Sequence, residues 1–181
     1  INVFPTFPEY VETFRKFAKS LTPAPSPEGE GSDTGCLFTP GIHFEDVEWT
    51  PRMVLRAKRI NATVTIVYNY LMREGSITKA VDKNKLRKNL DDKFIVIDTL
   101  NALIENHPQC QWLRNMRSSM AEGVITTVAA HFYDERKQYI AQLRARQVFP
   151  LSIHQQSKTY KRRAMLINVS PRLYCWMRGD L

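Results

Sequence analysis

The sequence holds little glycine and little cysteine, and both shortages narrow the class of protein. Seven glycines among 181 residues are few for the tight turns of an all-β protein. Three widely spaced cysteines, Cys36, Cys110 and Cys175, include no CxxC pair, so neither a disulfide framework nor a cysteine-based zinc site is expected. Unpaired thiols suit a reducing compartment, and we predict a nuclear or cytosolic protein.

Long apolar runs are also missing. No stretch approaches the roughly 20 apolar residues that cross a bilayer. The first ten residues are polar and aromatic, unlike the basic and then apolar start of a signal peptide. We therefore expect no membrane partner.

Catalytic motifs are absent as well. The chain contains no GxSxG, no Walker A loop and no GxGxxG. The best local group is His131, Asp134 and Glu135, which can share one helical face but are more simply a solvated polar surface. We expect no enzymatic activity, no metal and no cofactor; a site assembled only in space is the remaining alternative.

Charge is divided unevenly along the chain. Residues 1–50 hold three basic and eight acidic side chains, a net charge of −5, whereas residues 51–181 hold 23 basic and ten acidic side chains, a net charge of +13. A basic body behind an acidic leader indicates two functional parts.

The first 36 residues are predicted to form an arm and a linker in front of a helical domain. Residues 8–20 carry one apolar stripe, made by Tyr10, Phe14 and Phe17, as in an amphipathic helix. The following segment is rich in proline, glycine, serine and acid, which is typical of a flexible linker. The chain is thus divided into an arm (1–21), a linker (22–36) and a domain (37–181).

The domain is predicted to be all-α, an irregular bundle of five to seven helices. Its clearest helix is expected over residues 50–75, with Thr50 as the cap, Pro51 at the first helical position and Gly75 just past the end. The preceding residues 37–49 are expected to pack on the domain in an extended form, and the alternative is a short recognition motif.

The next helices are placed by their start and stop signals. Asp91 or Asp92 is expected to begin a helix that ends at Asn106, with residues 77–89 forming a separate short helix or loop. A helical stretch at 110–147 contains Gly123, which marks either a break or a close contact between helices.

Two helices are expected at the C-terminal end. Ser152 matches the capping-box pattern and predicts a helix that continues to about Val169. Ser170 and Pro171 then begin a last helix, which Gly179 ends. The alternative for residues 164–177 is a β-hairpin.

Lys and Arg clusters provide the candidate binding residues. The side chains expected to contact nucleic acid or an acidic partner are Arg52, Arg56, Arg59, Lys83, Lys85, Arg87, Lys88, Lys158, Tyr160, Lys161, Arg162 and Arg163. Another basic cluster occupies residues 136–146. Tyr160 beside three cations suits stacking on a base. The competing interpretation is a solvated surface, and convergence of the clusters on one face would favour DNA or RNA.

The main functional hypothesis is a non-catalytic scaffold or adaptor domain within a protein or nucleoprotein complex; nucleic-acid binding is the alternative. The adaptor hypothesis is supported by a surplus of tryptophan and methionine. These side chains belong to the core when buried and form adaptable contacts when exposed: Met72, Trp112, Met116, Met120, Trp176 and Met177. The arm could dock by Tyr10, Phe14 and Phe17 in a groove of its own domain, of a second copy or of another protein.

Overall fold

The computed structural model describes residues 38–60, 82–154 and 156–179. Within these ranges the chain forms six α-helices and one 3-10 turn and has no strand, which confirms the prediction of an all-α bundle. The arm and linker, with Tyr10, Phe14 and Phe17, lie outside the described residues, and their predicted roles stay predictions.

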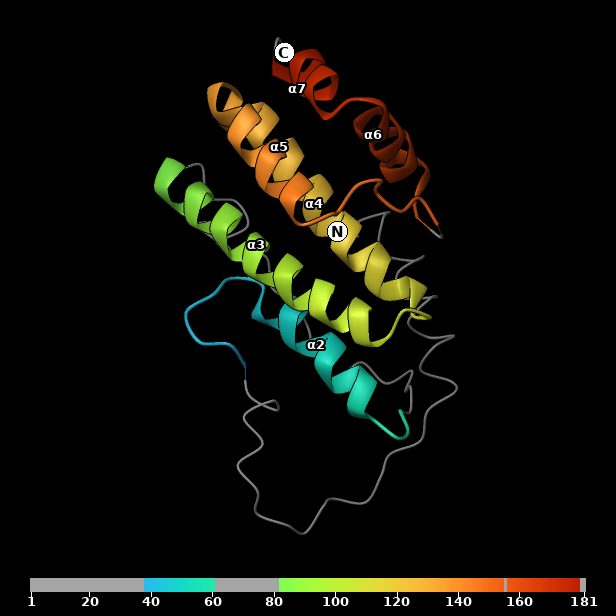
Figure 1. Ribbon diagram of the computed structural model, residues 1–181. Helices are drawn as coiled ribbons and strands as arrows, with labels where there is room; N and C mark the ends of the chain where they lie inside the picture. Colours follow the sequence, from blue (N-terminus) through green and yellow to red (C-terminus); the bar gives the residue numbers. More distant parts are fainter. Residues whose placement is uncertain (1–37, 61–81, 155, 180–181) are drawn as a thin grey trace, which may run out of the picture.

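Two long antiparallel helices form the centre of the domain. Helix α3 (Lys83–Asn106) and helix α4 (Gln111–His131) are joined by a short turn and pack along their lengths (Figure 1). Helix α2 (Glu45–Arg56) packs against the outer side of α3.

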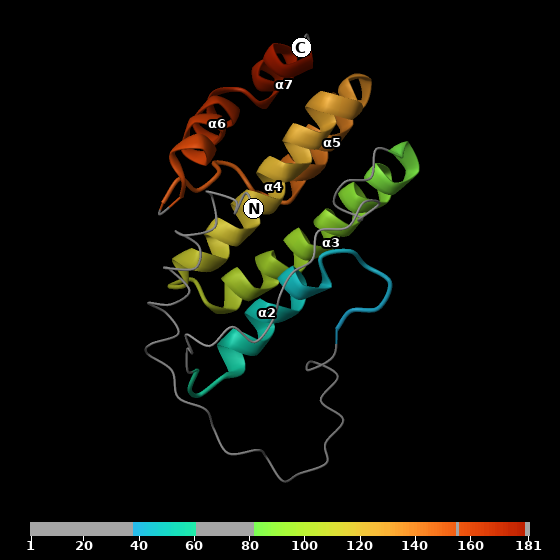
Figure 2. The same cartoon turned by 180° about the vertical axis from the view of Figure 1, so that it is seen from behind.

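The C-terminal half covers the other side of this pair. After the 3-10 turn η3 (Tyr133–Glu135), helix α5 (Arg136–Ala145) runs back along α4. Helix α6 (Lys158–Val169) and helix α7 (Pro171–Gly179) lie beyond α4, on the side away from α2 (Figure 2). The helices therefore follow one another as layers: α2, α3, α4 with α5, and α6 with α7.

The core has two parts that match these layers. The larger part joins α3 to the C-terminal helices through side chains that include Ile97, Ile125, Leu143 and Ile167, all at most 2% exposed. The smaller part lies between α2, α3 and α4 around Val96, Leu100 and Leu113. Both parts follow the three- and four-residue apolar spacing of the sequence.

The helix predicted over residues 50–75 starts earlier in the structure than predicted, and it ends before residue 75. It begins at Glu45, after Phe44 with a φ of 65°, so residues 45–49 are helical and not extended. Acidic residues in the first turn favour this earlier start because they interact with the positive end of the helix dipole. Pro51 lies inside the helix, Ala57 adopts an extended backbone, and residues 61–75 lie outside the described part.

The predicted start at Asp91 or Asp92 is also wrong, because α3 begins at Lys83. The side chain of Asp82 accepts hydrogen bonds from the backbone N–H groups of Asn84 (2.8 Å) and Lys85 (3.0 Å), as a capping residue does. Residues 83–89 are thus part of the same helix, whose end at Asn106 is as predicted.

The stretch at 110–147 divides at Phe132 and not at Gly123. At Gly123 a Cβ atom would lie 3.0 Å from Nζ of Lys93, the far end of a long side chain from α3, and no backbone atom is that close. The break at Gly123 is therefore wrong, and the close contact between helices stays a prediction.

Ser152 does not cap a helix. Its backbone N–H donates to the Ser118 hydroxyl (2.8 Å) and its own hydroxyl donates to Asn115 (2.7 Å), so contacts with α4 occupy it. Ser157 caps α6 by accepting from the N–H of Tyr160 (3.2 Å). The last helix begins at Pro171 and ends at Gly179 as predicted, and the hairpin alternative is wrong.

Candidate interaction surface

The basic cluster of α2 lies at the end of that helix. Arg52 is held by Glu48, with 2.8 Å between guanidinium and carboxylate. Arg56 and Arg59 have exposed side chains.

Two of the four cations in the α3 cluster are paired with acids, one from η3 and one from α3 itself. Arg87 makes two hydrogen bonds, of 2.6 and 2.8 Å, to Glu135, and this contact holds the pKa of Glu135 below its ordinary value. Lys88 lies 2.9 Å from the buried carboxylate of Asp92. The remaining members are exposed: Lys83 and Lys85.

The cluster of α6 is the least neutralised by acids. Arg163 faces Glu122 of α4, with 3.1 Å between Nε and Oε1. Lys158 and Arg162 are exposed and Lys161 is half-buried. The prediction for Tyr160 is wrong, because its ring is 7% exposed and packs in the core, where it cannot stack on a base.

These clusters do not form one basic face. Helix α2 and helix α6 occupy opposite outer layers of the domain, and the end of α2 lies far from the start of α3 (Figures 1 and 2). The convergence that would favour nucleic acid is therefore not found.

A second surface feature appears on α6 and α7, where large apolar side chains point away from the core. On α6, Tyr160, Ala164 and Ile167 form the buried face, and the helical period places the exposed residues Met165, Leu166 and Val169 on the opposite face. Val169 is 79% exposed. The same arrangement continues on α7 with Leu173, Trp176 and Met177.

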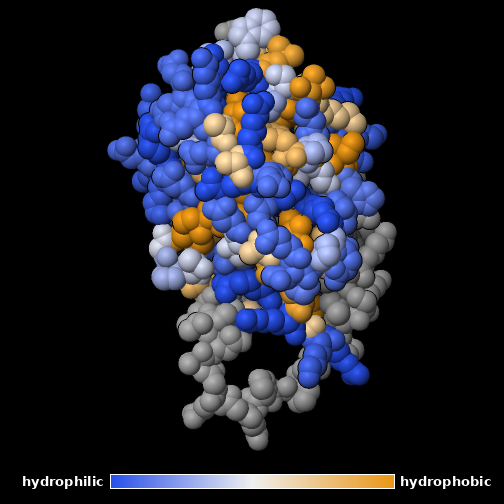
Figure 3. Space-filling model, in the orientation of Figure 1, coloured by the Kyte–Doolittle hydropathy of each residue, from blue (hydrophilic) through white to orange (hydrophobic). Residues whose placement is uncertain are grey.

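The charged side chains of α6 and α7 are all basic. Residues 158–179 contain six cations and no acid: Lys158, Lys161, Arg162, Arg163, Arg172 and Arg178. Figure 3 shows orange apolar and blue polar side chains next to one another over these helices. We call α6 and α7 with these side chains the C-terminal surface.

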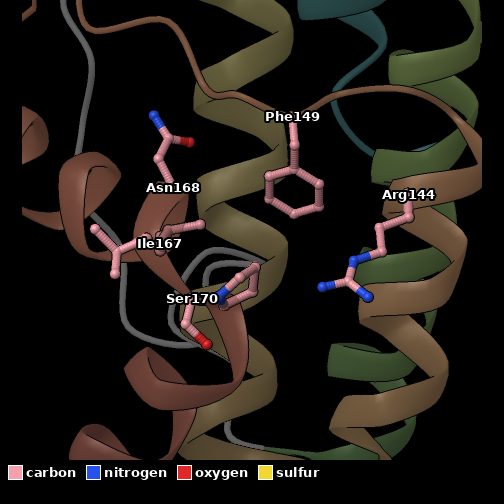
Figure 4. Close-up of a pocket in the computed structure, with 7 residues that line it drawn as sticks. Arg144, Phe149, Ile167, Asn168 and Ser170 are labelled. Atoms are coloured by element: carbon pink, nitrogen blue, oxygen red, sulfur yellow. The ribbon is translucent and has the colours of Figure 1, made fainter.

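Two hollows border the C-terminal surface. One, of about 200 Å³, lies where α6 meets α7; Arg144 extends into it from α5, and Phe149 enters from the loop that precedes α6 (Figure 4). Val169 is also among the residues that line it. The other, of about 400 Å³, lies between α6 and α7 and is lined by Thr159, Arg162, Arg163, Leu166, Tyr174 and Arg178. Both hollows thus combine arginine with apolar side chains of the exposed face.

Buried charge lies beneath the larger hollow. Burial raises the pKa of Glu122, although the cations Arg163, Lys93 and Arg178 act in the opposite direction. Burial also lowers the pKa of Lys93 and raises the pKa of the Tyr174 hydroxyl. The fold therefore places one acid among several cations in a poorly solvated position.

The sequence signal for this surface is its surplus of tryptophan and methionine, but the sequence alone does not show which of these side chains are exposed and which belong to the core. Trp112, Met116 and Met120 do pack against the core, whereas Trp176 and Met177 are exposed, and Met72 lies outside the described residues. The distinguishing pattern is a helix with apolar residues on two opposite faces and no acid.

Other kinds of site find no support in the described part of the chain. No group of three or more His, Cys, Asp and Glu side chains there is arranged to share a metal ion, and Glu135 of the His131 group is paired with Arg87. Of the helices that the structure describes, none has an apolar stretch of membrane-crossing length.

Comparison with models of known families, with characterised proteins and with solved structures finds no match. The surface of the described residues is therefore the feature that points to a function.

Proposed function

We propose that the chain is a non-catalytic interaction domain that holds an acidic, amphipathic segment of a partner protein on the C-terminal surface. The observation that carries the proposal is the apolar outer face of α6 and α7. A helix with two apolar faces is normally covered on both. The inner face of α6 is covered by α4 and α7, and the outer face has no cover among the described residues.

The positive charge of the C-terminal surface favours an acidic partner. Residues 158–179 contribute six cations and no acid to the C-terminal surface, and of these cations Arg163 is paired with Glu122 of α4. A segment with an apolar stripe between acidic side chains matches both properties. A second copy that docked by the same face would bring like charges together, which opposes association.

Nucleic acid matches this surface less well. A phosphate backbone would pair with the cations but would leave Val169, Leu173 and Trp176 in water. The clusters on α2 and α3 lie in other layers, and several of their cations already face acids. We place the complex in the nucleus or cytosol, because three widely spaced cysteines without a CxxC pair suit a reducing compartment.

The test uses a synthetic helical peptide with leucines at i, i+3, i+4 and i+7 and glutamates on its other faces. Fluorescence anisotropy measures the affinity of the protein for this peptide. Leu173→Ser should weaken binding by about fivefold to tenfold, because its apolar contact is lost. Ile95→Ser is the matched control, since Ile95 on α3 is 42% exposed and Leu173 is 44% exposed. The control should bind like the wild type.

Three further probes test the helical spacing and the two other kinds of partner, a membrane and nucleic acid. A peptide of the same composition but without the helical spacing should bind more weakly; equal binding, or equal effects of the two substitutions, contradicts the proposal. Tighter binding to phosphatidylserine vesicles or to a DNA oligonucleotide than to the helical peptide would replace it with a membrane or nucleic-acid function.

A further inference from the structure

The larger hollow of the C-terminal surface has the donors of an anion site. Arg162 and Arg163 reach it from α6, and Arg178 reaches it from α7, one turn after Tyr174. Thr159 adds a hydroxyl group. Guanidinium groups and hydroxyls are the donors that proteins use to bind phosphate and carboxylate oxygens.

A buried donor in this hollow has no partner. Tyr174 is 3% exposed, and its hydroxyl makes no hydrogen bond within the described residues. Buried hydroxyls nearly always have a partner, because leaving one unpaired is unfavourable. Nε of Arg163 is likewise buried and contacts Glu122 without hydrogen-bond geometry. The Tyr174 hydroxyl can therefore donate to an anion that enters the hollow, whereas Nε of Arg163 faces Glu122.

The charge of the walls indicates which anion this is. Three arginines line the hollow, and the Glu122 carboxyl group lies 3.1 Å from one of them, Arg163. A single carboxylate would leave part of the positive charge unbalanced, whereas a phosphate monoester, with a charge of about −1.5 to −2 at neutral pH, matches it. The volume of about 400 Å³ exceeds that of one phosphate and admits the group that carries it.

We propose that the hollow between α6 and α7 binds a phosphate monoester, supplied by a phosphorylated side chain of the partner segment. The identity of that carrier rests on the proposed function, whereas binding of phosphate itself does not. The guanidinium groups of Arg162 and Arg178 contact the phosphate oxygens, and the Tyr174 hydroxyl donates to it from the base of the hollow. Leu166 connects this site to the apolar outer face.

The first experiment titrates inorganic phosphate at constant ionic strength and follows amide NMR shifts. Saturable shifts are expected at residues 159–163 and 174–178. Arg178→Gln should weaken binding by about tenfold, since a charge-assisted hydrogen bond is lost. Arg172→Gln is the matched control, because Arg172 is exposed on the same helix but does not line the hollow.

Tyr174→Phe separates binding from folding. Because its hydroxyl has no internal partner, the variant should unfold in phosphate-free buffer at a temperature equal to or above that of the wild type. It should nevertheless bind phosphate several-fold more weakly. Unchanged phosphate affinity in this variant, or equal losses in Arg178→Gln and Arg172→Gln, would refute the site.

The second experiment compares the helical peptide with a version in which one glutamate is replaced by phosphoserine. About tenfold tighter binding of the phosphopeptide, abolished by Arg178→Gln, is expected. If the glutamate peptide binds and neither phosphate nor phosphoserine adds affinity, the phosphate site is wrong and the proposed function stands. If phosphate binds and neither peptide does, the hollow takes a free phosphate compound and the partner is wrong.

Discussion

Folding raises the pKa of Glu122, because it buries this carboxyl group. Glu122 is buried on α4 and faces Lys93 on α3, Arg163 on α6 and Arg178 on α7, yet burial outweighs these cations and raises its pKa. An acid with a raised pKa stabilises the fold while protonated, and that contribution is lost as the pH rises through the folded-state pKa. As the pH rises above the ordinary pKa of a glutamate, about 4.3, the wild type should therefore lose stability relative to Glu122→Gln.

Thermal unfolding of both proteins at increasing pH measures the effect. The difference in unfolding temperature, wild type minus Glu122→Gln, should decrease steadily with pH. Parallel curves would mean that the cations compensate fully for burial.

Pairing of individual charges was the part of the site that the sequence could not predict. Arg87 and Glu135 are 48 residues apart, and only the folded chain brings them into contact. Tyr160 lies beside three cations in the sequence, but the helical period turns its ring into the core. Local composition thus located the basic clusters without showing which cations remain available.

At the scale of the helix, Asp82 determines where α3 begins. Its side chain accepts from two backbone N–H groups that otherwise lack helical partners. Asp82→Ala should lower the free energy of unfolding by about 1 kcal/mol and reduce amide protection at residues 83–86. Asp91→Ala, an exposed position inside the helix, should change stability by less than about 0.5 kcal/mol in chemical denaturation. Equal losses would show that Asp82 is not a cap.

Helix interiors and ends were easier to predict than helix starts. The end of α3 at Asn106 and both ends of α7 follow from local signals of Pro and Gly. Starts were misplaced because several residues offer equivalent caps. Tertiary contacts decide between them: Asp92 binds Lys88, and Ser152 binds side chains of α4.

At the scale of the whole molecule, the order of layers determines which part of the core each outer helix joins. Helices α6 and α7 join the larger core through Ile167, Tyr174 and Cys175, whereas α2 is in the smaller core and packs mainly on α3. The all-α class followed from apolar periodicity, but no local pattern reveals which helix faces stay uncovered. The C-terminal surface could thus be recognised only after the layers were known.

The attachment of α2 gives a test of this layered organisation. Asp92 on α3 accepts the backbone N–H of His43 (2.8 Å) and binds the Lys88 ammonium group, which also donates to the Gly41 carbonyl (2.8 Å). These bonds hold the turn before α2 against α3. Asp92→Asn removes the charge and replaces one acceptor oxygen with an NH2 group, so His43 and Lys88 lose a charged acceptor. Loss of a hydrogen bond to a charged group weakens such an attachment by about 1.5–3 kcal/mol, so amide hydrogen exchange in α2 should accelerate by about tenfold or more.

Exchange in α4 and α7 should change little in the same variant, because the larger core does not depend on this attachment. Hydrogen exchange followed by mass spectrometry distinguishes the outcomes. Acceleration limited to residues 45–56 means that α2 opens as a separate unit while the C-terminal surface stays intact. Uniform acceleration through α7 would show that all layers unfold together, and the substitution would then also weaken partner binding at a surface it does not touch.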